Sequence, residues 1–85
     1  MSFVPFINHD PCTDVAYVYL SPARFSAESR ELDAARMVDY AEDGQVRGVE
    51  LLYVSRGVDL TGVPEMDTVR RLLEEAGIRV EVPAQ

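Results

Sequence analysis

The feature that most constrains the fold is the pair Asp43 and Gly44, which joins two apolar-rich runs of sequence. Asp-Gly between such runs is the strongest short-range signal for a β-hairpin, because Gly adopts positive φ without strain and Asp tolerates it. The hairpin spans residues 36–54, and its second arm, residues 46–54, contains no strand breaker stronger than Gly48. We therefore predict that this arm is the central strand of a sheet.

Two registers of this hairpin are compatible with the sequence. A two-residue loop, which is a type I′ turn, pairs Val38 with Val49 and Tyr40 with Arg47. A three-residue loop with a bulge at the Gly shifts the pairing by one residue, to Asp39 with Arg47 and Met37 with Val49. The sequence leaves both registers open.

The composition is that of one ordinary globular domain. The chain has 85 residues, of which 47% are apolar and 27% are charged, so it should fold. A domain of this size buries roughly 60 to 65% of its unfolded surface, so its core is thin and a partner subunit would add stability. Fifteen acidic and eight basic residues give a net charge of −7. This charge argues against binding nucleic acid or anionic lipid and favours a basic protein partner.

The compartment is predicted from cysteine content and hydropathy. One cysteine excludes an internal disulfide and supplies no zinc framework, which is typical of a protein of the reducing cytoplasm. The N-terminus has no basic flank followed by a long apolar segment, so we predict no signal peptide. The longest apolar run is residues 15–20, far short of the about twenty residues that cross a bilayer. We expect a soluble cytoplasmic protein.

Three further strands are predicted before the hairpin. Residues 3–8 contain Pro5, which donates no ladder hydrogen bond and so confines this strand to a sheet edge. Residues 15–20 are β-branched and aromatic, and alternation places Ala16, Val18 and Leu20 on the face opposite Val15, Tyr17 and Tyr19. A short third strand is expected around residues 28–32.

Several of these residues together resemble a known family. They are Asp10, Pro11, Asp14, Tyr17, Val18, Leu20, Glu31, Leu32, Val38, Asp39, Tyr40, Asp43, Gly44, Val46, Gly48, Val49, Glu50 and Leu51. Over residues 6–54 the chain resembles the small bacterial family known as domain of unknown function 2283. The resemblance implies a compact antiparallel β-meander and no established activity. His9, Cys12 and Tyr19 depart from the family pattern, and Tyr19 makes the second face of its strand more apolar.

The C-terminal third is predicted to add one helix and one strand. Residues 64–76 place Met66, Val69, Leu72, Leu73 and Ala76 on one side of a helix that begins near Pro64 and ends at Gly77. Residues 78–82 alternate as a short edge strand. We predict one compact α+β domain over residues 1–85. Its mainly antiparallel β-meander sheet, ordered by consecutive hairpins, is covered on one face by this helix.

The residue types that carry metal or nucleophile chemistry gather in one turn. His9, Asp10, Cys12 and Asp14 form this cluster, but the chain holds one His and one Cys in all, too few for a zinc site or a Cys-His nucleophile. A structural turn, with the Asp10 side chain accepting a backbone N–H, is the main interpretation. A metal or redox role is the alternative.

Two strand carboxylates are the candidates for acid–base chemistry. Glu50 lies between Val49 and Leu51, where a partly buried carboxylate could act as a general acid or base. Asp39 is similar, although a cross-strand pair is its simpler role. No phosphate-binding or nucleophile-elbow motif is present in the sequence, and we predict no cofactor.

The main functional hypothesis rests on the strand tyrosines. One helix covers one face of a sheet, so the face of Tyr17 and Tyr19 is left without an obvious cover, and such faces usually meet another chain. We therefore predict a non-catalytic acidic interaction module with a candidate interface at Tyr17 and Tyr19. It would act as a homodimer or as the antidote-like partner of a basic protein. The alternative is a small enzyme or ligand-binding domain that uses Glu50 or Asp39 in a sheet-lined pocket.

Overall fold

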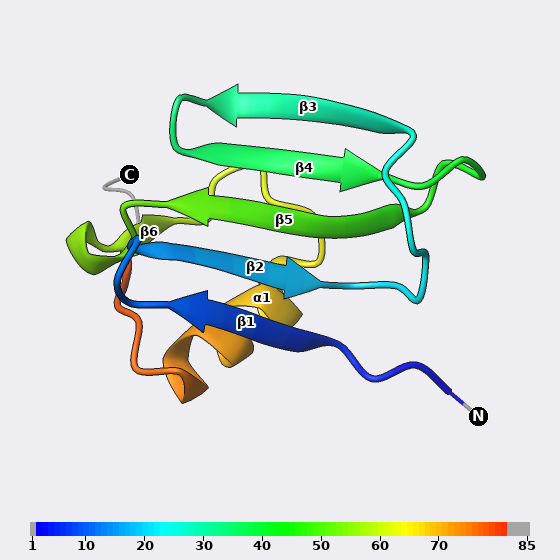
Figure 1. The fold of residues 1–85 in the computed structure, drawn as a ribbon. Helices are drawn as coiled ribbons and strands as arrows, with labels where there is room; N and C mark the ends of the chain where they lie inside the picture. The colour runs from blue at the N-terminus through cyan, green and yellow to red at the C-terminus, as the bar shows by residue number, and fades with distance from the viewer. Residues whose placement is uncertain (1, 82–85) are drawn as a thin grey trace.

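The computed structural model describes residues 2–81, which form a five-stranded sheet, one α-helix and a two-stranded sheet (Figure 1). The strands of the large sheet are β1 (Phe6–Asp10), β2 (Val15–Tyr19), β3 (Glu28–Asp33), β4 (Arg36–Tyr40) and β5 (Val46–Leu52). A 3₁₀ helix, η1 (Val54–Arg56), is followed by β6 (Val58–Asp59), α1 (Met66–Glu75) and β7 (Val80–Glu81). The predicted α+β class is confirmed.

The large sheet has the order β1-β2-β5-β4-β3, and every neighbouring pair is antiparallel. The prediction that the second arm of the hairpin is the central strand is confirmed, because β5 is the middle strand. The order departs from consecutive hairpins at one place, where β2 pairs with β5 instead of β3. Residues 20–27 are long enough to carry the chain past the ends of β5 and β4, so that β5, the longest strand of the sheet, occupies the middle.

The β4–β5 hairpin combines the two predicted registers. Its turn is the three-residue loop, because Ala41 N–H donates to Gln45 O at 2.8 Å and Gly44 has φ +88°. The pair Val38 and Val49 nevertheless lies in register, as the two-residue loop predicted. A bulge explains how the three-residue loop and the Val38–Val49 pair occur together. Between the partners of Asp39 and Tyr40, β5 has one residue more than β4, and this extra residue shifts the register by one.

The Gly44 turn allows a first stability test. Apart from Gly44 itself and its two neighbours in the chain, no described residue has an atom within 4 Å of the place where a Cβ on Gly44 would stand, so strain at positive φ is the main effect of a substitution. We expect Gly44→Val to destabilise the protein by roughly 1 to 3 kcal/mol. Thermal melting should show a fall of roughly 4 to 8 °C per kcal/mol. A melting temperature equal to that of the unchanged protein would contradict the assigned turn.

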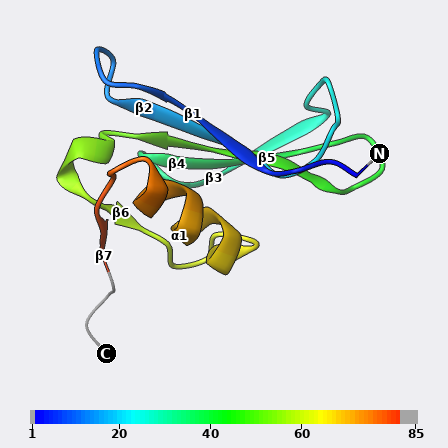
Figure 2. The same ribbon diagram turned by 90° about the horizontal axis from the view of Figure 1, so that it is seen from below.

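The helix α1 packs on one face of the sheet, and the opposite face has no helix over it (Figure 2). The buried apolar side chains lie between α1 and the sheet or along the segments that lead to α1. They are Ala16, Val18, Leu20, Val38, Val49, Leu51, Val54, Val58, Leu60, Val63, Val69, Leu72, Leu73 and Ile78. The predicted alternation of β2 is therefore confirmed.

The ends of α1 follow the sequence signals with one exception. Gly77 has φ +78°, and Ile78 N–H donates to Leu73 O at 2.9 Å, which is the bond of a Schellman motif. The predicted start at Pro64 is wrong: the helix begins at Met66, and Glu65, at the N-cap with φ +50°, separates Pro64 from its first turn. The sequence pattern places Met66 on the buried stripe, but the residue is 38% exposed because it stands at the first, outermost turn.

The last part of the chain contains more structure than predicted. The sequence predicts a loop over residues 55–63, but this segment includes part of η1 and all of β6. The final strand, predicted over residues 78–82, is β7 at Val80–Glu81, and Val82 lies outside the described residues. It pairs with β6 in parallel and does not join the large sheet. The crossover through α1 is what makes this parallel pairing possible.

Candidate functional site

The face of the large sheet opposite α1, called here the uncovered face, is organised in two rows that cross all five strands. Paired residues of an antiparallel ladder lie on the same face. The first row is Phe6, Tyr19, Gly48, Asp39 and Ser29. The second row is Asn8, Tyr17, Glu50, Met37 and Glu31. The predicted site residues therefore share one face.

Tyr17, Asp39, Ser29 and Arg47 form a hydrogen-bonded group, called here the tyrosine network. The Tyr17 hydroxyl donates to Asp39 Oδ2 at 2.7 Å, and the Ser29 hydroxyl donates to Asp39 Oδ1 at 2.6 Å. Arg47 Nη1 donates to the Tyr17 hydroxyl oxygen at 2.7 Å and lies 4.0 Å from Asp39 Oδ2. Both carboxylate oxygens of Asp39 are thus occupied within the chain.

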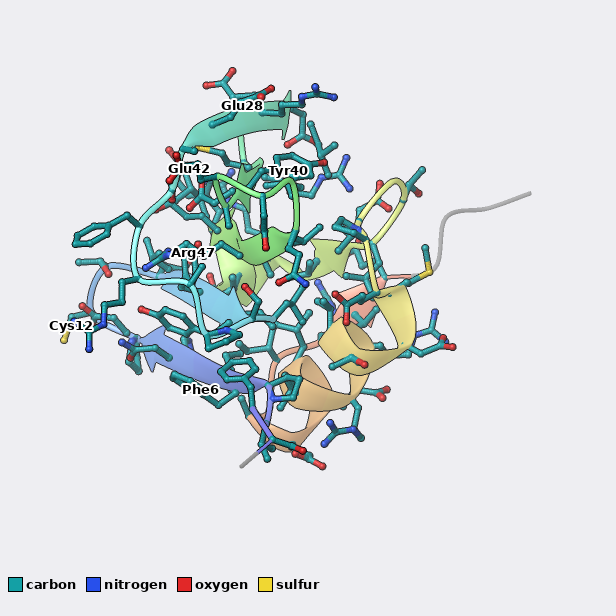
Figure 3. The ribbon with its side chains drawn as sticks, turned by 90° about the vertical axis from the view of Figure 1, so that its right-hand side faces the viewer. Phe6, Cys12, Glu28, Tyr40, Glu42 and Arg47 are labelled. Carbon is teal, nitrogen blue, oxygen red and sulfur yellow. The ribbon has the colours of Figure 1, made fainter. Side chains whose placement is uncertain are left out.

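Arg47 joins the network to the crossing segment that precedes β3. Its Nε donates to Ala23 O at 3.2 Å and its Nη2 donates to Arg24 O at 3.3 Å. The guanidinium carbon also lies 5.4 Å and 5.5 Å from the ring centroids of Tyr17 and Tyr19, within the range of cation–π attraction. Arg47 therefore covers part of the face that was expected to be bare (Figure 3).

The protonation of Tyr17 follows from its surroundings. Burial, followed by the hydrogen bond to the Asp39 carboxylate, raises the pKa of Tyr17 well above its ordinary value. The hydroxyl accordingly remains protonated at neutral pH and donates to Asp39. A tyrosinate acting as a base is not what this arrangement stabilises.

Four rings, Phe3, Phe6, Tyr19 and Tyr17, form a continuous aromatic patch at the β1 side of the uncovered face. Phe6 stacks on Tyr19 with centroids 4.6 Å apart and an interplanar angle of 15°. Tyr19 lies 4.6 Å from Tyr17, and Phe3 lies 6.1 Å from Phe6. Phe6 remains 49% exposed, so the stack ends in water at the sheet edge.

Glu50 does not share a pocket with Asp39. The hollow that Glu50 lines has a volume of about 80 Å³ and also includes Glu31, Met37 and Leu52 but not Asp39. Small-molecule sites are typically ~300 to 1,000 Å³. The two carboxylates predicted as alternatives for acid–base chemistry therefore lie on the same face in different surroundings.

The turn between β1 and β2 is held by its acidic residues. Asp10 Oδ1 accepts the Cys12 N–H at 3.0 Å, which confirms the predicted role of Asp10. Asp14 accepts the Ser55 N–H at 2.8 Å and the Ser55 hydroxyl at 2.6 Å. This hydroxyl is the main reason why the pKa of the Asp14 carboxyl is lowered. The two hydrogen bonds from Ser55, which lies in η1, hold the turn against η1.

The same turn forms one wall of a hollow of about 350 Å³. His9, Asp14, Ser55, Ile78 and Arg79 are among its lining residues. Cys12 is exposed. Across residues 2–81, no group of three or more His, Cys, Asp or Glu side chains is arranged to hold a metal ion.

Sequence reasoning did not identify Tyr17 and Ser29 as partners of Asp39, although one of the two predicted hairpin registers places Arg47 opposite Asp39. Simple alternation along β5 places Arg47 on the same side as Val49 and Leu51, which are buried under α1. The bulge reverses the direction of Arg47 and sends it to the uncovered face. The Asp-Gly turn was the one sequence signal that indicated a bulge.

These features define a small α+β domain whose antiparallel sheet carries a helix on one face and a tyrosine network on the other. The family described as "Protein of unknown function (DUF2283)" matches residues 7–55, which are 49 of the 85 residues, and the chain belongs to that family. The matched region covers β2 to β5 and nearly all of β1, so the predicted resemblance is confirmed. The helix α1 and the parallel strand pair lie beyond it.

The other comparisons add no relatives. Neither the curated proteins nor the solved structures contain a match to this chain. No helix within residues 2–81 has the length and apolar character needed to span a membrane.

Proposed function

We propose that the protein is a non-catalytic interaction module of the cytoplasm that pairs with a second copy of itself through the aromatic patch. The observation that carries the proposal is the ring stack from Tyr17 through Tyr19 to Phe6, which runs to a sheet edge with Phe6 half exposed. Stacked aromatic side chains in water are typical of surfaces that bind another chain.

The charge distribution favours a second copy at this surface. The rings of the patch carry no charge, and Arg47, which lies over two of them, is 4.0 Å from the Asp39 carboxylate, while Glu50 stands opposite Tyr17 on β5. Two copies that each carry a net charge of −7 can therefore approach at the uncharged rings of Tyr19 and Phe6, which lie farther from Glu50, while the rest of each molecule repels the other. Salt should strengthen the association, because it screens that repulsion.

An antidote-like role toward a basic protein is the second version of this function. A cationic partner would seek carboxylates that are free of internal partners. One such carboxylate, Glu31, lies on the edge strand β3, whereas the aromatic patch lies on the β1 side. A self-association surface and a surface for a basic partner are thus compatible in one chain.

The enzyme hypothesis has less support. Asp39 accepts two hydroxyl hydrogen bonds, and the hollow beside Glu50 has a volume of about 80 Å³, too small for a typical substrate. Glu50→Gln distinguishes the two functions, because it should leave self-association unchanged.

Tyr19→Lys is expected to shift the protein toward monomer by roughly tenfold or more in dissociation constant, since an unpaired ammonium would have to lose its water in the interface. Light scattering across a concentration series, at low and high salt, measures the shift. The matched control is Tyr53→Lys, because Tyr53 is 52% exposed and contacts Arg56 outside the patch. Both variants change the net charge equally, so a loss confined to Tyr19→Lys locates the interface.

A monomer at every concentration in both salts would contradict self-association. Circular dichroism of the Tyr19→Lys variant should match that of the unchanged protein, because the core lies on the other face of β2. Equal effects of the two lysine variants would show that charge alone, and not the patch, controls association.

A further inference from the structure

The strand β3 forms an edge of the large sheet, and all six of its residues are exposed. It contacts the rest of the molecule mainly through β4. Figure 3 shows Glu28, on β3, at the end of the sheet farthest from α1. Neither face of β3 is covered by another element of the described chain. Its outer side therefore faces water.

The direction in which the backbone N–H and C=O groups of β3 point follows from the hydrogen bonds that β4 makes with its two neighbours. Leu52 N–H donates to Ala35 O at 2.8 Å, so the odd-numbered residues of β4 bond β5 and the even-numbered ones bond β3. Ala27 N–H donating to Tyr40 O at 2.8 Å agrees with this alternation. Consequently the N–H and C=O groups of Ser29 and Glu31 point outward, away from the sheet.

The opposite edge strand, β1, is shielded from pairing with another chain, whereas β3 is not. Pro5 precedes β1 and Pro11 follows it, and α1 runs behind β1 in contact with it (Figure 1). Flanking prolines and a covering helix are the usual means of closing a sheet edge to further strands. No proline occurs from β3 through β5. The two edges thus differ in their access to another chain.

The charges along β3 indicate what this edge accepts. Three of its six side chains are carboxylates and one is a guanidinium. Glu28 pairs with Arg30 at 2.8 Å, while Glu31 and Glu50 have no ion-pair partner within residues 2–81. Glu31 and Glu50 lie on the same face on either side of Met37. A second copy of β3 would meet like charge here, whereas a cationic segment would not.

We propose that β3 binds an extended, lysine- or arginine-bearing segment of a partner protein as a sixth antiparallel or parallel strand. The outward backbone groups of Ser29 and Glu31 supply the ladder hydrogen bonds. A cationic side chain opposite Glu31 lies on the uncovered face, with its head beside that carboxylate and its alkyl stem directed toward Met37. The net charge of −7 draws such a partner in from a distance.

The test uses a short fluorescent peptide of alternating lysine and valine, with binding followed by fluorescence anisotropy. Glu31→Lys should weaken binding by roughly tenfold or more, because it places like charge beside the peptide. The matched control is Glu42→Lys, since Glu42 is exposed in the β4–β5 turn and the charge change is the same. Ser29→Pro, compared with Ser29→Ala, removes one outward N–H and should also weaken binding.

Two further measurements separate strand addition from simple charge attraction. A peptide with the same lysines but with methyl groups on alternate backbone nitrogens should bind much more weakly than its parent. Hydrogen exchange should show new protection at the amides of Ser29 and Glu31 and none along β1. Equal binding of the methylated peptide, protection at β1, or no binding of the parent peptide would each overturn the proposal. Tyr19→Lys should bind the peptide as the unchanged protein does, because the two surfaces are separate.

Discussion

Leu73→Ala is expected to lower the free energy of unfolding by roughly 2 to 5 kcal/mol, because Leu73 is fully buried between α1 and the sheet and its removal leaves a cavity. The lower half of this range is expected, since a thin core collapses partly around a lost side chain. Such a loss is a large share of the total stability of a domain of this size. Urea denaturation followed by far-ultraviolet circular dichroism measures it.

Met66→Ala is the matched control for Leu73→Ala. It also truncates an apolar side chain on α1, but Met66 is 38% exposed, so we expect a change within roughly half a kcal/mol. A loss for Leu73→Ala as small as that of the control would show that α1 does not pack on the sheet as described.

Gly48→Ala should destabilise the protein by roughly 1 to 3 kcal/mol or more, because there is no room for a methyl group at this point of the sheet. A Cβ on Gly48 would stand 2.8 Å from Tyr17 Cζ and would also collide with Tyr17 Cε1 and with the carbonyl oxygen of Val18. The carbonyl belongs to the β2 ladder and cannot move aside. Moving the Tyr17 ring instead would break its hydrogen bond to Asp39, which is nearly buried.

A double-mutant cycle tests this explanation. In a Tyr17→Ala background the ring is absent and the carbonyl contact remains, so Gly48→Ala should be less destabilising than in the unchanged protein. Equal effects in the two backgrounds would show that the ring does not occupy the space beside Gly48. Gly44→Ala is a useful reference, since Gly44 has open space but positive φ.

The interaction surfaces divide the uncovered face by charge. The β1 side presents uncharged rings and the β3 edge presents Glu31, while Glu50 lies on the middle strand opposite Tyr17; neither carboxylate has an ion-pair partner among the described residues. Arg47 on β5 and Asp39 on β4 offset each other's charge at 4.0 Å. A protein with this division can associate with itself through one side and with a cationic segment through the other.

The elements with a strong local signal were predicted well. The alternation of β2, the hairpin at Gly44 and the helix end at Gly77 each depend on a few neighbouring residues. The central position of β5 also followed, because a long apolar strand gains most from neighbours on both sides. The family resemblance over residues 6–54 rested on the same local patterns and is confirmed over residues 7–55.

The tyrosine network was not predictable in the same way. Tyr17 and Asp39 are 22 residues apart, and Arg47 is 30 residues from Tyr17. Their contact depends on the pairing of β2 with β5 and on the bulge that turns Arg47 to the uncovered face. No local pattern specifies either feature, because strand pairing is decided by the burial of whole faces.

The sequence by itself determined the α+β class, most strand positions, the helix, the shared face of Tyr17 and Tyr19, and the acidic character of the chain. Tertiary structure alone decided that β2 pairs with β5 and that the Asp39 carboxylate accepts hydrogen bonds from Tyr17 and Ser29. It also decided that α1 packs behind β1, whereas no helix or strand packs on either face of β3. The physical reason is the separation along the chain over which each kind of interaction acts. Turns, caps and alternation act between residues close in sequence, whereas strand order, bulges and edge coverage depend on how distant segments share one thin core.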